Sequence, residues 1–186
     1  MTEKTSLMRN EVLEIPVAVD RLLTHGTAGI AKAADEVRAL DPAFAVTVAR
    51  GSSDHICTYL KYACELILGV PVASVGPSIA SIYGASLKLN GGLCLSVSQS
   101  GQSPDIVEMA RSARHEGALA IAITNDASSP LAEASNHALD IHAGPELSVA
   151  ATKTFVTSAV AGLLLLAEWR QDEALLKAIH QLPEAL

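Results

Sequence analysis

The sequence predicts an α/β protein, a three-layer αβα sandwich built on a doubly wound, five-stranded parallel sheet. Short apolar segments alternate with longer amphipathic segments along most of the chain, and this alternation is typical of strand–helix–strand units. Alanine, valine, leucine and isoleucine supply most of the apolar residues, whereas only 3% of residues are aromatic. Such a composition suits helices packed closely on a sheet. Strands joined in this way run parallel through right-handed crossovers, so we expect helices on both faces of the sheet.

The predicted elements follow in order. Five strands are expected, at 44–49, at 70–75, from Leu93, at 119–124 and at 138–142. Helices are expected where apolar residues recur at helical spacing, over 8–23, 28–40, 54–68, 78 to about 87, 104 to about 116, a short one after 129–130, 149–169 and 172 to about 181. Pro16 should kink or restart the first helix because proline lacks a backbone N–H. The chain is therefore divided into an N-terminal helical arm (1–26), a central domain (27–170) and a C-terminal helix (171–186).

Charge and hydropathy exclude several kinds of partner. The formal net charge is −7 and the pI is about 5.3, whereas nucleic acids and anionic membranes attract basic surfaces. The longest apolar run, 159–167, is far shorter than the ~20 residues of a membrane-spanning helix, and the N-terminus lacks the layout of a signal peptide. The amphipathic arm lacks the basic excess of a membrane-surface helix, so we expect it to pack on a partner subunit.

The three cysteines, Cys57, Cys64 and Cys94, have neither the spacing of metal ligands nor that of a disulfide framework. Thiols of this kind are typical of a reducing compartment. We therefore expect a cytoplasmic protein with buried, unreactive thiols.

The segment 93–106 predicts an anion-binding turn. An apolar strand leads directly into a hydroxyl-rich turn, and the turn leads into a helix for which Ser103 is a favourable N-cap and Pro104 a favourable first residue. The first backbone N–H groups of a helix have no carbonyl partners, and the macrodipole adds positive charge there. Side-chain donors surround the same point, those of Ser98, Gln99, Ser100 and Ser103. A phosphate group would fit this arrangement.

A second serine turn follows another predicted strand. Gly51, Ser52 and Ser53 come after strand 44–49 and before the helix that begins near Asp54. Ligands of open α/β sheets bind at the carboxyl ends of the strands, near a topological switch point. Each turn alone is also explained by local capping, because serine and glycine are common in turns. Two serine turns at one sheet edge favour a shared phosphate site.

Several other signatures are missing from the sequence. There is neither a G-x-x-x-x-G-K-[ST] motif for ATP nor a G-x-G-x-x-G motif for a dinucleotide. The G-x-S-x-G elbow is absent too, so Ser100 is interpreted as a hydrogen-bond donor and not as a nucleophile. His55 could touch a ligand, although a structural role is favoured; the other histidines lack metal-ligand spacing and are assigned to surface or core, namely His25, His115, His137, His142 and His180. We expect no cofactor and no metal.

The segment 143–155 holds a cation in an unusual place. Lys153 lies early in a mostly apolar predicted helix, for which Ser148 is a candidate cap, and the macrodipole disfavours a cation there. Glu146 or a bound anion could compensate this charge, and the alternative is a lysine that extends to solvent. Glu146 and Lys153 are therefore weak candidates for a chemical role.

These motifs, in this order, resemble those of sugar isomerase (SIS) domains: 50–55 (RGSSDH), 98–103 (SQSGQS), 124–125 (TN), 143–146 (AGPE) and 149–153 (VAATK). The likeness is greatest to the first SIS domain in the isomerase half of glucosamine-6-phosphate synthase and to glucosamine- and galactosamine-6-phosphate deaminase/isomerases. Residues 8–16 resemble the opening helix of that family. The resemblance covers nearly the whole chain.

The resemblance implies a flavodoxin-like or Rossmann-like sheet that binds a phosphorylated (amino) sugar in a cytoplasmic homo-oligomer, at least a dimer. It implies aldose–ketose isomerisation with release of an amine. Carried over by position, the phosphate contacts are Ser52, Ser53, Ser98, Gln99, Ser100 and Ser103. Val149 and Ala150 would offer backbone contacts near the reactive end of the sugar, and Gly51 would let the chain approach closely.

The sequence also departs from the family pattern. No glutaminase domain precedes Met8, and the family's proton-transferring glutamate belongs to a second SIS domain, whereas this chain ends at Leu186. The catalytic residues are therefore unknown, and we expect a fragment or half of a two-domain isomerase/deaminase. A non-catalytic phosphosugar sensor and a single-domain isomerase that completes its site across an oligomer are the alternatives.

Overall fold

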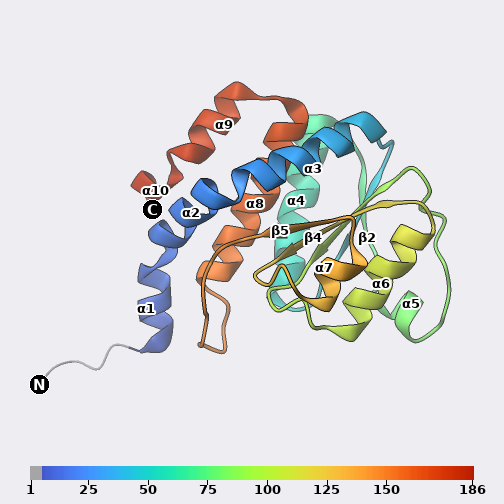
Figure 1. Ribbon diagram of the computed structural model, residues 1–186, viewed down its shortest axis with the longest axis horizontal. Coiled ribbons are helices and arrows are strands. Elements are labelled where there is room, and N and C mark those ends of the chain that lie inside the picture. Colours follow the sequence, from blue (N-terminus) through green and yellow to red (C-terminus); the bar gives the residue numbers. More distant parts are fainter. Residues whose placement is uncertain (1–5) are drawn as a thin grey trace, which may run out of the picture.

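The computed structural model describes residues 6–186 and confirms the predicted α/β fold. All five strands are parallel and form one sheet in the order β2-β1-β3-β4-β5. Their bounds are β1 (Ala45–Val48), β2 (Val72–Ser74), β3 (Leu93–Val97), β4 (Leu119–Thr124) and β5 (His137–Asp140). Helices cover both faces of the sheet, which gives the predicted three layers (Figure 1).

Two apolar cores flank the sheet because side chains alternate along each strand. Leu93, Leu95 and Val97 of β3 belong to the core under α3 (Thr27–Leu40), α4 (Ser52–Leu68) and α8 (Lys153–Arg170), whereas Cys94 belongs to the core on the other face. That second core is covered by α6 (Pro104–His115) and α7 (Pro130–Ala134), with α5 (Ser78–Ser81) packed beside α6 (Figure 1). Helix α8 packs against both α3 and α4, so it forms the centre of the first layer.

The N-terminal residues form two helices, α1 (Leu7–Leu13) and α2 (Ile15–His25), and Pro16 lies in the first turn of the second. This confirms the restart predicted at Pro16. Helix α2 buries one face in the first core and lies beside α10 (Leu182–Ala185), which follows α9 (Glu173–His180). The boundaries at 26 and 170 stay predictions, as does the docking of the arm on a partner, and residues 1–5 of that arm lie outside the described part. Within residues 6–186, no helix combines the length and apolar character needed to cross a bilayer.

Two predicted helices differ in extent. The helix expected from 78 to about 87 is wrong beyond its first turn, because α5 ends at Ser81 and the residues from Ser81 to Ser86 are exposed. A short helix without a buried face is only marginally stable. Helix α8 begins at Lys153 and not at Val149, for a reason that the contacts of Glu146 explain below.

The thiols are expected to be unreactive in the native protein. Cys57, Cys64 and Cys94 are all buried and free, and burial raises the pKa of Cys57 to about 12 and the pKa values of Cys64 and Cys94 to about 11, from an ordinary value of 9.0. At pH 8 the thiolate fraction therefore falls at least about 100-fold, and the reaction with a disulfide reagent such as DTNB should slow by about the same factor. Reaction of the folded and the urea-unfolded protein with DTNB measures the ratio of the two rates. A native thiol that reacts as fast as free cysteine would contradict the expected slowing.

Candidate functional site

The two serine turns leave neighbouring strands at the switch point of the sheet. Strands β1 and β3 pair directly, with Val48 opposite Ser96. From β1 the chain crosses to β2 on one side, and from β3 it crosses to β4 on the other. A crevice opens where connections diverge in this way, at the carboxyl ends of the strands. The sheet therefore brings residues 50–53 and 98–103 together, as the sequence predicts.

An ion pair joins the first serine turn to the start of α6, and both α4 and α6 begin without side-chain caps. The Arg50 guanidinium pairs with the carboxylate of Asp105, in the first turn of α6. Gly51 and Ser103 occupy the N-cap positions of α4 and α6, and neither accepts a capping hydrogen bond through a side chain. Ser103 thus has the predicted position, while its hydroxyl makes no such bond. Two helix N-termini with backbone N–H groups open to a ligand meet at this edge.

The predicted phosphate contacts differ in exposure. Ser52 and Ser100 are exposed, Ser53, Gln99 and Ser103 are half-buried, and Ser98 is buried. Gly51 has a φ of +59°, and apart from the adjoining backbone no atom lies within 4 Å of the position that a Cβ would occupy. A ligand could therefore approach the backbone closely at Gly51. A graded shell of hydroxyl groups around open backbone suits an anion that is partly enclosed and partly in solvent.

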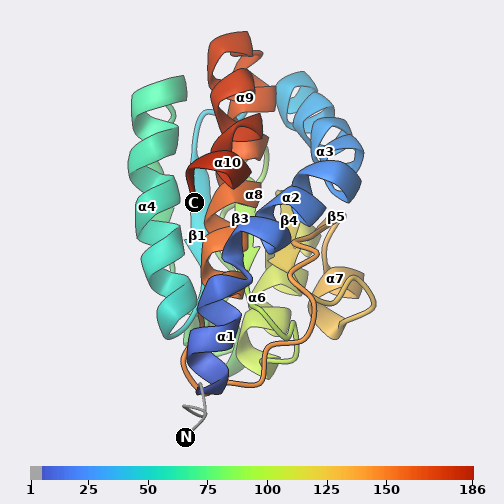
Figure 2. The same cartoon turned by 90° about the vertical axis from the view of Figure 1, so that its left-hand side faces the viewer.

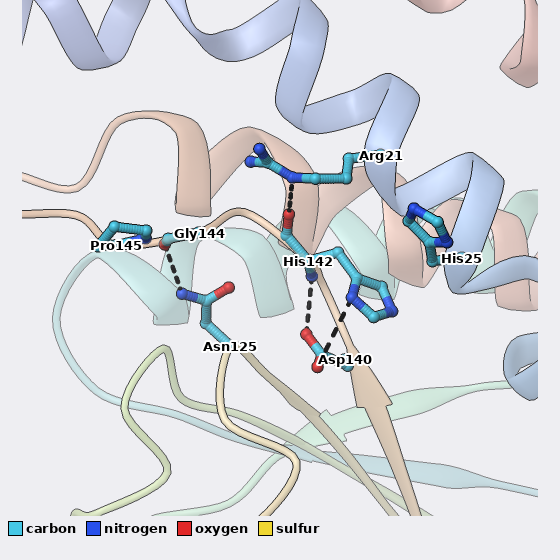
Figure 3. Close-up of a pocket in the computed structure, with 7 residues that line it drawn as sticks. All are labelled: Arg21, His25, Asn125, Asp140, His142, Gly144 and Pro145. Atoms are coloured by element: carbon cyan, nitrogen blue, oxygen red, sulfur yellow. Dashed lines mark hydrogen bonds and ion pairs between the residues drawn. The ribbon is translucent and has the colours of Figure 1, made fainter.

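The residues after β4 connect the second serine turn to the segment that follows β5. The backbone N–H of Asn125 donates to the carbonyl of Gln99 at 3.0 Å. The Asn125 side chain accepts from the N–H of Ala143 at 2.9 Å. It also donates to the carbonyl of Gly144 at 2.9 Å, a bond drawn in Figure 3. Asn125 therefore fixes the start of segment 143–153 relative to the serine turn.

Glu146 has a different role from the one that the sequence suggests. Its carboxylate accepts from the backbone N–H groups of Thr152 at 3.0 Å and Thr154 at 3.2 Å, and from both threonine hydroxyls. It thus caps α8 from outside the helix, which is why α8 begins four residues later than predicted. Ser148 does not cap α8, because its N–H and hydroxyl donate to Glu11.

Two of the alternatives that the sequence leaves open for Lys153, compensation by Glu146 and extension to solvent, are wrong. The Lys153 ammonium pairs with the carboxylate of Glu14, and the lysine side chain is only 3% exposed. Glu14 lies 139 positions earlier in the chain, so no local pattern could identify it. Val149 and Ala150, the predicted sugar contacts, lie exposed in the connection before α8. In both views this connection lies at the same end of the molecule as the start of α4 (Figures 1 and 2).

A cavity of about 590 Å³ opens beside the ends of β4 and β5, and none of the predicted site residues lines it (Figure 3). Its walls are Arg21, His25, Asn125, Asp140, His142, Gly144 and Pro145. Arg21 donates to the carbonyls of His142 and Ala143, each at 2.7 Å. His142, at a φ of +48°, lies with Nδ1 3.7 Å from the Asp140 carboxylate and its ring edge-on to His25.

Sequence reasoning assigned His25 and His142 to surface or core and missed this cavity. Its walls come from α2 and from the ends of β4 and β5, so no spacing along the chain signals it. Among residues 6–186, no three side chains of the His, Cys, Asp or Glu type are grouped to hold a metal ion.

Comparison with known proteins identifies relatives across most of the chain. Glutamine–fructose-6-phosphate aminotransferase (isomerizing) from Sulfolobus acidocaldarius is 36% identical over 127 residues, which cover 68% of this chain and 21% of that protein. The structure of a candidate phosphosugar isomerase from Silicibacter pomeroyi DSS-3 matches with a TM-score of 0.95 at 64% identity, over 97% of this chain and 55% of that one. This chain therefore spans about a fifth of the first relative and about half of the second.

The fold is shared more widely. The Vibrio vulnificus NanR protein, complexed with ManNAc-6P, matches with a TM-score of 0.69 at 16% identity, over 96% of this chain and 67% of that one. The sequence-family model of the SIS domain matches residues 44–168, from the start of β1 almost to the end of α8. Those residues include both serine turns and the segment from Ala143 to Lys153. By this match and by its sheet topology, the chain belongs to the SIS domain family.

Proposed function

We propose that this chain is the phosphosugar-binding domain of an amino-sugar-phosphate isomerase or deaminase, with a substrate of the glucosamine-6-phosphate or fructose-6-phosphate type. The observation that carries the proposal is the meeting of two serine turns and two uncapped helix N-termini at the switch point between β1 and β3. The names of two of its similar relatives, an isomerizing fructose-6-phosphate aminotransferase and a candidate phosphosugar isomerase, support it. So does a sugar phosphate bound to a protein of the same fold.

Different residues would bind different parts of the substrate. The backbone N–H groups at the starts of α4 and α6 would hold the phosphate, because helix N-termini stabilise an anion. The hydroxyls and the Gln99 amide would add side-chain donors, the hydroxyls being those of Ser52, Ser53, Ser98, Ser100 and Ser103. The sugar would extend toward the backbone of Val149 and Ala150. In an isomerisation of this class the ring opens and a carboxylate moves a proton between C1 and C2. Holding the open chain in place supplies part of the rate.

We propose structural roles for the two weak catalytic candidates. Glu146 is occupied by four donors from Thr152 and Thr154, and Lys153 is buried against Glu14. A proton-transfer group must reach the reacting carbons with a free polar atom, so the acid and base of the reaction would be other groups.

The cellular setting is part of the proposal. Three buried free thiols are typical of a protein kept in a reducing compartment, so we place the protein in the cytoplasm. Apolar side chains exposed on α1 and α4, among them Leu13 and Leu66 at 68% and 83% exposure, would be covered in a homodimer.

Calorimetric titration tests the site. We expect the chain to bind fructose 6-phosphate and glucosamine 6-phosphate, and Ser100→Ala to weaken both about tenfold, because a hydrogen bond to a charged group contributes roughly 1.5–3 kcal/mol. Ser86→Ala is the matched control, since Ser86 is exposed on the connection before β3, and it should leave both affinities unchanged. Equal affinities for Ser100→Ala and the unaltered protein, or equally strong binding of unphosphorylated fructose, would refute the proposal.

A further inference from the structure

The connection between β5 and α8 holds the proposed sugar contacts without packing them. Val149 is fully exposed and Leu147 is 73% exposed. The connection contains neither helix nor strand. Apolar packing therefore does not determine the backbone conformation at 147–150, and polar contacts must do so.

Among residues 6–186, one carboxylate supplies those contacts from outside the connection. Glu11 of α1 accepts from the backbone N–H of Leu147, from the N–H of Ser148 at 3.2 Å to each oxygen, and from the Ser148 hydroxyl. The same hydroxyl lies 3.0 Å from the carbonyl oxygen of Ala150, so its one proton is shared between the two acceptors. Glu11 is thus linked through Ser148 to both neighbours of Val149.

The burial pattern of α1 is reversed from that of an ordinary helix. Glu11 is its only buried residue, 5% exposed, whereas Leu7 and Leu13 are 58% and 68% exposed. Glutamate is almost never fully buried unless it is paired, and burial of a charge is unfavourable unless hydrogen bonds compensate it. The Ser148 hydroxyl, and after it the Leu147 N–H, hold the pKa of the Glu11 carboxyl below its ordinary value of 4.5. At neutral pH the group is therefore ionised and accepts these donors as a charged acceptor.

An apolar interface does not hold α1 against the connection, because a cavity lies between them. A cavity of about 260 Å³ lies between α1 and the connection, lined by Glu11, Glu14, Arg21, Leu147 and Lys153 among others. The arm therefore touches the connection through selected polar groups and not through a filled apolar interface. Figure 2 shows α1 standing at the end of the molecule where the connection to α8 runs.

We propose that Glu11 is a positioning residue for the sugar end of the site: its carboxylate sets the backbone at 147–150, and through it the groups that Val149 and Ala150 present to the sugar. This inference rests on the proposed function. The serine turns, which would hold the phosphate, make no hydrogen bond to Glu11 among the described residues. Loss of Glu11 should therefore affect recognition of the sugar and spare recognition of the phosphate.

Calorimetry with two ligands tests this separation. Glu11→Gln keeps the size of the side chain but replaces one carboxylate oxygen by an NH₂ group. That group is a donor, so it cannot accept from the N–H of Leu147 or Ser148. We expect the affinity for fructose 6-phosphate to fall about tenfold, while the affinity for inorganic phosphate stays within about twofold of the unaltered protein. Asp20→Asn is the matched control, an exposed carboxylate on α2, and it should change neither affinity.

Each outcome is decisive. If Glu11→Gln binds fructose 6-phosphate as the unaltered protein does, or if both affinities fall together, Glu11 is not a positioning residue for the sugar. If the unaltered protein binds neither ligand, the proposed function fails and this inference fails with it. If Glu11→Gln does not fold, Ser148→Ala removes only the hydroxyl and should weaken fructose 6-phosphate about threefold without weakening phosphate; equal loss for both ligands would overturn the inference.

Discussion

Replacement of Gly101 by alanine is expected to destabilise the protein by about 3 kcal/mol, since a left-handed residue with a Cβ is strained and an overpacked interior resists expansion. Gly101 has a φ of +62°, and an added Cβ would lie 2.5 Å from Ser129 Cβ and 3.1 Å from Thr124 Oγ1. Ser129 is completely buried and caps α7 by accepting from the N–H of Ala132. To relieve the clash, either Ser129 must move and uncap α7, or the serine turn that holds Gly101 must move.

Thermal unfolding measures this effect. At about 3 kcal/mol the melting temperature should fall by roughly 6–12 °C, and the affinity for fructose 6-phosphate should fall with it because Gly101 separates Ser100 from Gln102 within the turn. Gly29→Ala is the matched control. Gly29 lies inside α3, and apart from its neighbours and the backbone of its own helix no atom lies within 4 Å of an added Cβ. Alanine there should therefore stabilise the helix by about 0.5–1 kcal/mol. A Gly101→Ala protein as stable as the Gly29→Ala protein would contradict the crowding at the turn.

Removal of Glu14 is expected to lower the free energy of unfolding more than removal of its partner Lys153. Lys153 is 3% exposed and Glu14 is 52% exposed. Glu14→Gln would leave a buried ammonium without its main partner and should cost about 2 kcal/mol, less than for a pair buried on both sides because Glu14 is half in water. Lys153→Met would leave only a carboxylate that water can solvate, so it should cost less than about 1 kcal/mol.

Urea unfolding of both single variants and the double variant checks this asymmetry. The double variant should be about as stable as Lys153→Met alone, since the cost of Glu14→Gln disappears when no charge remains to be stranded. A Lys153→Met protein that is less stable than Glu14→Gln would contradict the interpretation. It would mean that the lysine stabilises the start of α8 beyond its bond to Glu14.

The fold was accessible from the sequence because its signals are local. Strand β4 (Leu119–Thr124) lies where the apolar run predicts it, and the restart at Pro16 follows from the missing N–H. The helix after Pro77 was overextended because periodicity alone does not reveal whether a face will be buried. The start of α8 was misplaced because Glu146 reaches its threonine donors across a loop that has no periodic pattern.

The candidate site also has a part that the local sequence predicts and a part that it does not. Both serine turns are contiguous motifs after strands, so residue type and order are enough to predict them. Asn125 holds the start of segment 143–153 from 18 positions away, but two further groups come from the other end of the chain: Glu11 contacts Ser148 across 137 positions, and Arg21 contacts Ala143 across 122. Glu146, a bound anion and extension to solvent were the alternatives that the local sequence offered for Lys153, because the carboxylate that pairs with it lies on the distant arm. Only the folded chain shows these contacts.

A crystal structure of the chain with fructose 6-phosphate would show where the phosphate binds. We expect the phosphate between the two serine turns, within hydrogen-bond distance of residues from both 51–53 and 98–103, with the sugar directed toward Val149 and Ala150. A phosphate bound instead in the cavity lined by Arg21, His25 and His142 would contradict it, because the serine turns would then be only the local caps of α4 and α6.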